Sequence, residues 1–180
     1  FNPRTHLDGW ECAQTVIFIN CPDRPFLVDS LRIGLNSEIP IIHSLRSSPI
    51  WVLRDDKGIA IRFSGEEITN GHSEALIAIE IQALDDSRLK SLKLRLTKIL
   101  SDVDLVVSNH STMRSRLAAE ITSVKTLAPP HENLSEDIEF LNWMLDGAFV
   151  FLGVIAFELK NKDGIDYLCE EPDSRDGLFK

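Results

Sequence analysis

The N-terminal half of the chain alternates short segments with the two-residue period of a strand and longer segments with the period of a helix. Residues 15–20 (TVIFIN) are β-branched and aromatic, so we expect a strand there. A turn-rich segment with two prolines follows at 21–25. Leucines then recur at every fourth position, which predicts an amphipathic helix with Pro25 in its first position and Asp23 or Arg24 as its cap.

The middle of the chain predicts a hairpin and a further strand. Residues 41–54 continue extended, with Pro49 at an edge or an irregularity because proline cannot donate to a sheet. The turn at 55–58 (DDKG) leads into a return strand at 59–63. After a polar loop, residues 74–84 place isoleucines at alternate positions, as in a strand with one buried face.

A second amphipathic helix follows, capped at 85–87 (DDS), and its leucines repeat at spacings of three and four. Its lysines line the outer face, so this basic group indicates a solvated helix surface and not a nucleic-acid patch. Residues 104–108 (DLVVS) then predict a last strand. The order over 15–108 is strand, helix, strand with hairpin, strand, helix, strand. It predicts an α+β fold, a ferredoxin-like βαββαβ sandwich with an added hairpin and with both helices on one face of the sheet.

The remainder predicts helical connections and part of a second β-containing unit. Residues 111–127 carry apolar side chains at helical spacing, and Ala128-Pro129-Pro130 ends that helix. Asn133 and Glu136 form a capping box for a further helix. Two strands are expected after it, at 149–159 and 167–169.

These patterns predict four parts: an N-terminal extension at 1–14, the α+β domain at 15–108, a helical connection at 109–147, and the truncated start of a second unit at 148–180. We expect the chain to be an excised piece of a longer polypeptide, because it opens on Phe1 instead of Met and closes without a terminal signature.

Composition narrows the class of protein. Among 180 residues, 43% are hydrophobic and 26% charged, which is ordinary for a soluble globular protein. The net charge of −9 argues against nucleic acid as a partner, since phosphate binding needs clustered cations. No apolar run is long enough for a membrane helix. The three cysteines are widely spaced and fit neither a disulfide framework nor a zinc site, which favours a reducing cytoplasm.

Enzymatic machinery is not visible in these residues. The histidines have no metal-ligand spacing, so we expect no metal site. Neither common nucleotide-binding glycine motif occurs, nor does G-x-S-x-G, so we expect no cofactor and no catalytic residue in this segment. The paired carboxylates all fall in turns, loops or caps, where they favour local backbone bonding.

One segment retains candidate chemistry, the loop and helix start after the first strand. The N–H groups and positive dipole end of that helix suit a carboxylate ligand. Arg24 could pair with such an anion and Asp23 with an ammonium group. The alternative, a plain turn that these two residues cap and solvate, stays open.

Residues 21–30 (CPDRPFLVDS), placed between the first strand and the first helix, resemble the D-x-P-G-L-L-x-x-I opening of ACT domains, which share the βαββαβ order. More specifically, Gly9-Trp10 and 25–30 look like the N-terminal region of the large bacterial NAD-specific glutamate dehydrogenases. Further matches of that kind are Thr15-Val16, Ile41-Ile42-His43, Pro49-Ile50, Ile79-Glu80-Ile81, 113–117 (MRSRL), 140–144 (FLNWM) and 149–153 (FVFLG), the last like F-x-F-L-G-Y. The resemblance spans essentially the whole chain.

The resemblance implies a very long cytoplasmic parent enzyme that oxidatively deaminates L-glutamate to 2-oxoglutarate with NAD. Its dehydrogenase residues would lie far beyond Lys180, so this segment is implied to be an ACT-like regulatory or assembly module. The implied partners are the remainder of the parent chain, further copies in a homo-oligomer, and an amino-acid effector.

The candidate effector-binding residues are Asn20, Asp23, Arg24, Phe26 and Leu27. ACT domains that bind amino acids have glycine after the proline, so that backbone can approach the ligand, whereas this chain has Phe26. A bulky side chain there could fill the pocket, which favours a packing role. Two hypotheses therefore remain: an effector-binding regulatory domain, and a purely structural module that contacts other domains or subunits through its sheet. The missing motifs disfavour an independent enzyme.

Overall fold

The computed structural model describes residues 1–127 and 134–180. These residues form two compact units, Phe1–Val103 and Asp104–Lys180. The first unit holds a four-stranded antiparallel sheet, and the second holds two sheets of two strands each. In the described part of the chain, no helix combines the length and the apolar character that crossing a membrane requires.

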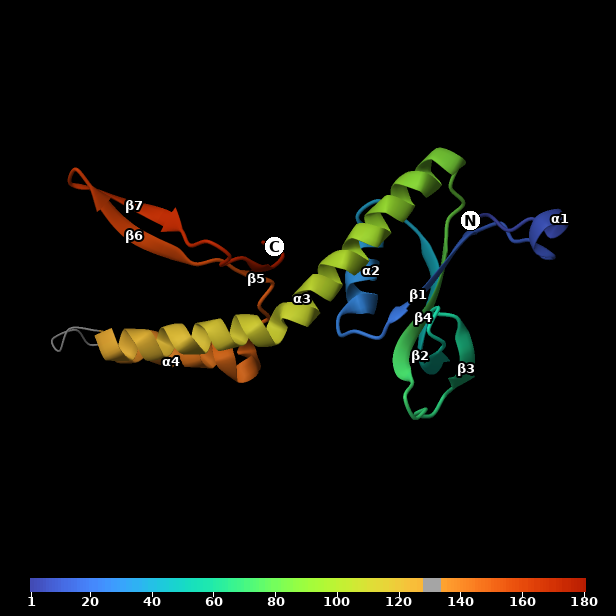
Figure 1. Ribbon diagram of the computed structural model, residues 1–180. Helices are drawn as coiled ribbons and strands as arrows, with labels where there is room; N and C mark the ends of the chain where they lie inside the picture. Colours follow the sequence, from blue (N-terminus) through green and yellow to red (C-terminus); the bar gives the residue numbers. More distant parts are fainter. Residues whose placement is uncertain (128–133) are drawn as a thin grey trace. The chain divides into compact units, whose positions relative to one another are not determined.

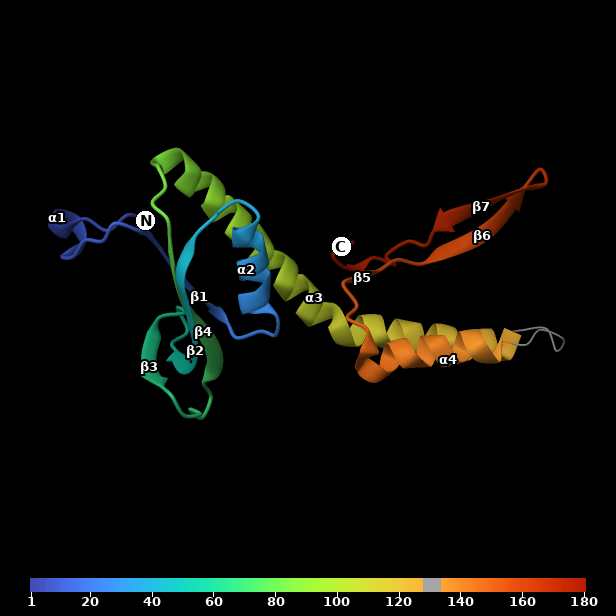
Figure 2. The same cartoon turned by 180° about the vertical axis from the view of Figure 1, so that it is seen from behind.

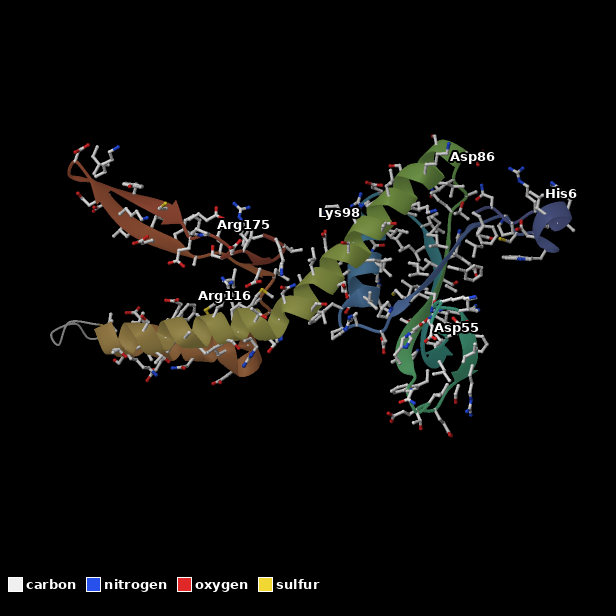
Figure 3. The ribbon with its side chains drawn as sticks, viewed as in Figure 1. His6, Asp55, Asp86, Lys98, Arg116 and Arg175 are labelled. Carbon is white, nitrogen blue, oxygen red and sulfur yellow. The ribbon has the colours of Figure 1, made fainter. Side chains whose placement is uncertain are left out.

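The first unit contains, in chain order, α1 (Thr5–Asp8), β1 (Thr15–Pro22), α2 (Leu27–Asn36), β2 (Ile42–Arg54), β3 (Ala60–Ser64), β4 (His72–Ile81) and the first part of α3 (Asp86–Leu127). The strand order in the sheet is β1-β4-β2-β3. The predicted α+β class with its added hairpin is confirmed. Asp55 explains the position of the hairpin turn (Figure 3), because its Oδ1 accepts hydrogen bonds from the N–H groups of Lys57 and Ile59.

The core of this unit lies between the sheet and the helices. Both views show α2 and the first part of α3 on the same side of the sheet (Figure 1 and Figure 2). Alternate residues of β4 face them, and Ile77, Ile79 and Ile81 are at most 2% exposed. From α2, Leu31 and Leu35 are fully buried. Each such side chain contributes about 1.5–3 kcal/mol of hydrophobic stabilisation, so the predicted leucine stripe is what fixes α2 to the sheet.

Pro49 lies in β2 opposite Ala75 of β4, in the stretch that β3 does not reach, since β3 pairs only with residues 51–54. The proline thus occupies a sheet edge, as its missing N–H led us to expect.

The predicted strand at 104–108 is wrong. These residues belong to α3, which runs from Asp86 to Leu127 and joins the two helices that the sequence predicted separately. The physical reason is that Val103, Val106 and Met113 continue the helical spacing and are at most 8% exposed. Burial of that face outweighs the β-preference of two adjacent valines.

The second unit contains the rest of α3, then α4 (Ser135–Trp143), the π-helical turn η1 (Met144–Ala148), β5 (Gly153–Val154), β6 (Phe157–Lys162), β7 (Ile165–Glu170) and β8 (Asp176–Gly177). The partner strand predicted around 167–169 is confirmed as β7, which pairs with β6. The helix stop predicted at 128–130 and the cap predicted at Asn133 lie outside the described residues.

The single strand predicted at 149–159 is only partly correct. Residues 149–152 have no regular structure, and the rest is divided into β5 and β6, which pair with different strands. The interruption follows from Ser174, whose hydroxyl bonds to both the N–H and the carbonyl of Ala156 and so takes the place of a strand partner.

The hairpin of β6 and β7 exposes apolar side chains. Leu159 and Leu168 lie directly opposite each other and are 67% and 66% exposed, and Ile165 is 70% exposed. A two-stranded hairpin has too little interior to bury such groups by itself.

Candidate functional site

The candidate loop joins the end of β1 at Pro22 to the start of α2 at Leu27. The predicted helix start is wrong by two residues, because Phe26 is the N-cap residue and Pro25 precedes it. The Phe26 side chain makes no capping hydrogen bond. The prolines hold the segment extended up to Arg24, and the helix begins only after the chain has turned at Phe26.

That turn places Phe26 in the left-handed region, with φ of 68° and ψ of 0°. A non-glycine residue in this region costs about 1–2 kcal/mol, because its Cβ approaches the following carbonyl oxygen. The side chain is 51% exposed, so packing returns little of this cost. The backbone at Phe26 therefore keeps a conformation for which glycine is the favoured residue.

Two of the candidate polar side chains are tied to the neighbouring strands. Asn20 accepts a hydrogen bond from Arg54 Nη2 on β2 at 3.2 Å. Asp23 accepts one from the Ser73 hydroxyl on β4 at 3.2 Å, and its N–H donates to the Ser73 carbonyl at 3.1 Å. The Asp23 bonds fix the loop to the sheet, and the bonds of both residues use polar atoms that a ligand would otherwise contact.

The other three candidate residues, Arg24, Phe26 and Leu27, differ in how far they are buried. Leu27 is 5% exposed and belongs to the core between α2 and the sheet, so its side chain is not available to a ligand. Arg24 is partly buried in the loop. The structure thus brings Asn20 and Asp23 to the start of β4 and leaves Phe26 exposed at the other end of the loop.

Sequence reasoning missed a charged cluster beside this loop, formed by Arg54, His72 and Glu74. Glu74 is 4% exposed, and its two carboxylate oxygens accept hydrogen bonds from Arg54 Nε and Nη2 at 2.6 and 2.7 Å. His72 Nε2 lies 2.7 Å from Glu74 Oε1. The Arg54 hydrogen bonds, above all, lower the pKa of Glu74 to about 2, whereas burial acts in the opposite direction. Glu74 is therefore a fixed anion at neutral pH.

Only the sheet register could have revealed this cluster. Ile50 is the residue paired with Glu74, and Arg54 lies four positions further along β2, so the contact depends on the length and twist of that strand. Across the described ranges 1–127 and 134–180, no group of three or more His, Cys, Asp or Glu side chains is arranged to hold a metal ion.

Comparison with known proteins decides the family. Residues 1–96 match the family model described as "Glutamate dehydrogenase, ACT1 domain". The chain belongs to this glutamate dehydrogenase ACT1 family. Over 185 residues it is 31% identical to a protein of Halomonas elongata named NAD-specific glutamate dehydrogenase, covering 99% of this chain and 12% of the relative. A protein of the same name from Pseudomonas aeruginosa is 30% identical over 167 residues, covering 90% of this chain and 10% of the relative.

The D-x-P-G opening to which the loop was likened has glycine where this chain has Phe26. The backbone of Phe26 adopts the left-handed conformation that glycine favours. The strand predicted at 104–108 lies beyond the matched residues.

The second unit holds its own buried charge. Arg116 projects from α3 toward the β5–β8 segment (Figure 3), and its Nε lies 2.8 Å from Asp176 Oδ2. Its Nη1 donates to the Ser174 carbonyl at 2.7 Å and its Nη2 to the Asp173 carbonyl at 3.2 Å. Asp176 is 5% exposed, so Arg116 supplies the charge that such a buried carboxylate needs. This contact gives a structural role to the segment 113–117, which the sequence singled out.

Proposed function

We propose that this chain is a non-catalytic regulatory or assembly domain of a large NAD-dependent glutamate dehydrogenase. The parent would convert L-glutamate and NAD to 2-oxoglutarate, ammonia and NADH in the cytoplasm. The support is the match of 1–96 to the ACT1 model, together with coverage of nearly the whole chain by two proteins named NAD-specific glutamate dehydrogenase. The chain spans about a tenth of the length of those relatives, so hydride transfer is assigned to the remainder of the parent.

The observation that carries an assembly role is the sheet face turned away from α2 and α3. We call it the open face; it includes Phe18 of β1 and Leu76 of β4, which are 64% and 43% exposed. A shallow hollow of about 490 Å³ lies between them and is bordered by Arg46 of β2. An apolar sheet surface with a polar rim suits contact with another subunit or domain. We therefore assign the open face to contacts within a homo-oligomeric parent.

The test changes the open face in the full-length enzyme. Leu76→Lys is compared with Leu94→Lys, which places the same charge on a 74% exposed position of α3. We expect Leu76→Lys to lower the oligomeric mass in light scattering, or to change the half-saturating glutamate concentration several-fold, with kcat within twofold of the wild type. Leu94→Lys should match the wild type in all three quantities. The proposal fails if both variants behave like the wild type, or if residues 1–180 alone oxidise glutamate with NAD.

Amino-acid sensing at the loop is a second candidate, supported by one specific observation. Phe26 adopts a left-handed turn of the kind that glycine favours, at the position where ACT domains that bind amino acids have glycine. The site would comprise Asn20, Asp23, Arg24, Phe26 and Leu27, although Leu27 is buried in the core and could contribute only backbone.

Calorimetry with a panel of amino acids tests this candidate on the wild type, on Phe26→Gly and on Phe26→Ala. If the aromatic side chain obstructs a real site, both variants should bind at least one amino acid about tenfold more tightly than the wild type does. If all three proteins bind every amino acid of the panel more weakly than millimolar, these amino acids are not effectors of this site. The assembly role would then be the proposed function that remains.

A further inference from the structure

The outer edge of β1 is only partly paired. In the sheet order, β1 is a terminal strand with β4 as its neighbour. On the other side of β1, the backbone hydrogen bonds found within the described residues are those that Phe1 makes with Val16. An edge strand of eight residues whose outward backbone groups are not all paired within the described residues is a template for a further strand.

The Phe1 contacts define the direction of such a strand. The Phe1 nitrogen donates to the Val16 carbonyl at 2.8 Å, and the Val16 N–H donates to the Phe1 carbonyl at 2.9 Å. Two residues that exchange both bonds form the hydrogen-bonded pair of an antiparallel ladder. Asn2 confirms the register, because its Oδ1 accepts a hydrogen bond from the Thr15 hydroxyl at 2.5 Å. Counting back from Phe1, the preceding residues would therefore lie opposite Ile17, Phe18, Ile19 and Asn20 in that order.

The same alternation leaves two further positions open on this edge. Val16, Phe18 and Asn20 direct their backbone groups away from β4, because the odd-numbered residues of β1 make the bonds to that strand, as the Asp23 N–H continues to do. In the described part of the chain, Val16 is paired with Phe1, while the N–H and carbonyl groups of Phe18 and Asn20 have no partner across the edge. An incoming strand would find four backbone groups in register.

A groove runs beside these positions on the helix side of β1. Its volume is about 590 Å³, and it is lined by Ile17 and Ile19 of β1 and by Leu89, Leu92, Leu96 and Leu100 of α3. The exposed Lys90 and Lys93 of α3 also line it. Such a groove accepts alternate apolar side chains of an added strand, with carboxylates favoured where the strand passes the lysines.

We propose that the residues immediately preceding Phe1 in the parent polypeptide form a fifth strand of this sheet, antiparallel to β1. The second and fourth residues before Phe1 pair with Phe18 and Asn20. The first and third lie opposite Ile17 and Ile19 and direct apolar side chains into the groove. This strand would supply the further sheet strand that the sequence predicted at 104–108, residues that are helical in the structure.

Two observations select this occupant over a second copy of the chain. The Phe1 backbone already holds the outward groups of Val16, which obstructs a β1 strand from another copy along the same edge. Close to nine tenths of each relative lies outside the match, and a parent of that length would have chain available to supply the strand. The inference rests on the proposed function in this one respect, that the chain is part of such a parent.

The test is a disulfide register scan in the full-length enzyme. A cysteine replaces the residue directly before Phe1 and is combined with Ile17→Cys, or with Ile19→Cys as the control two residues out of register. Opposed residues on this edge have Cβ atoms about 4.5–5.5 Å apart, within disulfide reach, whereas the control pair is about 7 Å or more apart. We expect the Ile17→Cys pair to form an intrachain bond at least tenfold faster, identified as a linked tryptic peptide. Equal rates, or a linked dimer on a non-reducing gel, would overturn the proposal.

Amide exchange of the wild-type full-length enzyme provides a second readout in case Ile17→Cys does not fold. Phe18 and Asn20 amides should exchange at least about 100-fold more slowly than free peptide, as for paired strands. Exchange at the rate of free peptide at both positions would also overturn the proposal. Neither readout depends on oligomeric mass or glutamate kinetics, so failure of the fifth strand and failure of the proposed function can be told apart.

Discussion

Arg54 of β2 and Glu74 of β4 form a two-pronged ion pair whose nitrogen and oxygen atoms are 2.6 and 2.7 Å apart. A third Arg54 nitrogen, Nη1, donates to the Gly58 carbonyl at 2.7 Å. One guanidinium thus links the hairpin turn, the edge of the candidate loop through Asn20, and the start of β4. Planar, bidentate geometry of this kind is specific to arginine.

Removal of Arg54 should leave the buried Glu74 carboxylate without its charged partner. We expect Arg54→Ala to lower the free energy of unfolding by about 2–3 kcal/mol in urea titrations at pH 7. Arg46→Ala, on an exposed part of the same strand, is the matched control and should change it by less than about 0.5 kcal/mol. If the two substitutions changed the free energy of unfolding equally, the ion pair would contribute no more to stability than an exposed arginine does.

The same pair predicts how stability depends on pH. The pKa of Glu74 is about 2 in the folded protein, against 4.5 for an unperturbed side chain. A carboxyl with a lowered pKa contributes its full stabilisation above its unfolded pKa and loses it as the pH falls from about 4.5 toward 2. Urea unfolding should therefore show wild type and Glu74→Gln converging over that range, because the other acidic groups are common to both proteins. A constant difference between pH 7 and pH 2.5 would contradict the assignment.

The left-handed conformation of Phe26 predicts an unusual order of stability for two substitutions at this position. Phe26→Gly and Phe26→Ala both remove the aromatic ring, but only glycine relieves the Cβ contact at φ of 68°. We expect the glycine variant to be more stable than the alanine variant by about 1 kcal/mol, the reverse of the usual order in a helix. Thermal and urea unfolding of the two variants measure the difference. An alanine variant as stable as the glycine variant would mean that the turn relaxes on substitution.

Gly177 in β8 should tolerate no side chain. It has φ of 63°, and a Cβ there would collide with the Leu152 carbonyl oxygen and lie 2.9 Å from the Gly153 Cα. We expect Gly177→Ala to destabilise the β5–β8 pair by more than about 2 kcal/mol, measured by amide exchange. Gly164→Ala is the control, since φ is 83° and nothing lies within 4 Å of its Cβ, so only the backbone cost of about 1 kcal/mol applies. Similar losses at both glycines would exclude the steric explanation.

Arg116 should stabilise the segment 173–177 locally. Its loss would remove two hydrogen bonds to backbone carbonyls. Among the described residues it would leave Asp176 with only Lys180 Nζ, at 4.0 Å, as a nearby cation. In Arg116→Ala we expect amide exchange at 173–177 to accelerate about 10–100-fold. Arg114→Ala, two positions earlier on α3, should leave those rates unchanged. Unaltered exchange in Arg116→Ala would mean that the segment is held by β5 alone.

Local patterns predicted most of the first unit because each element has one clear period. The leucines of α2, the isoleucines of β4 and the DDKG turn bury or expose side chains in the way their spacing indicates. The family resemblance, carried by short runs such as 25–30, also proved correct.

The errors arise where non-local packing decides. Val106 and Val107 favour a strand locally, yet the buried face from Val103 to Met113 keeps them helical. The position of Phe26 as the helix cap depends on a left-handed turn that a phenylalanine would not suggest. The pairing of Arg54 with Glu74 depends on sheet register, which no sequence pattern near either residue records.

The apolar hairpin of β6 and β7 affects how the protein must be handled in solution. Leu159, Ile165 and Leu168 are each at least 66% exposed, so concentrated samples should associate through this hairpin independently of the sheet in the first unit. Light scattering on wild-type residues 1–180 would then report association through the hairpin together with association through the sheet. The substitutions Leu159→Lys and Leu168→Lys, at directly opposed positions, would suppress association through the hairpin and leave the first unit unchanged. That doubly substituted protein is the appropriate background for any measurement of self-association on residues 1–180.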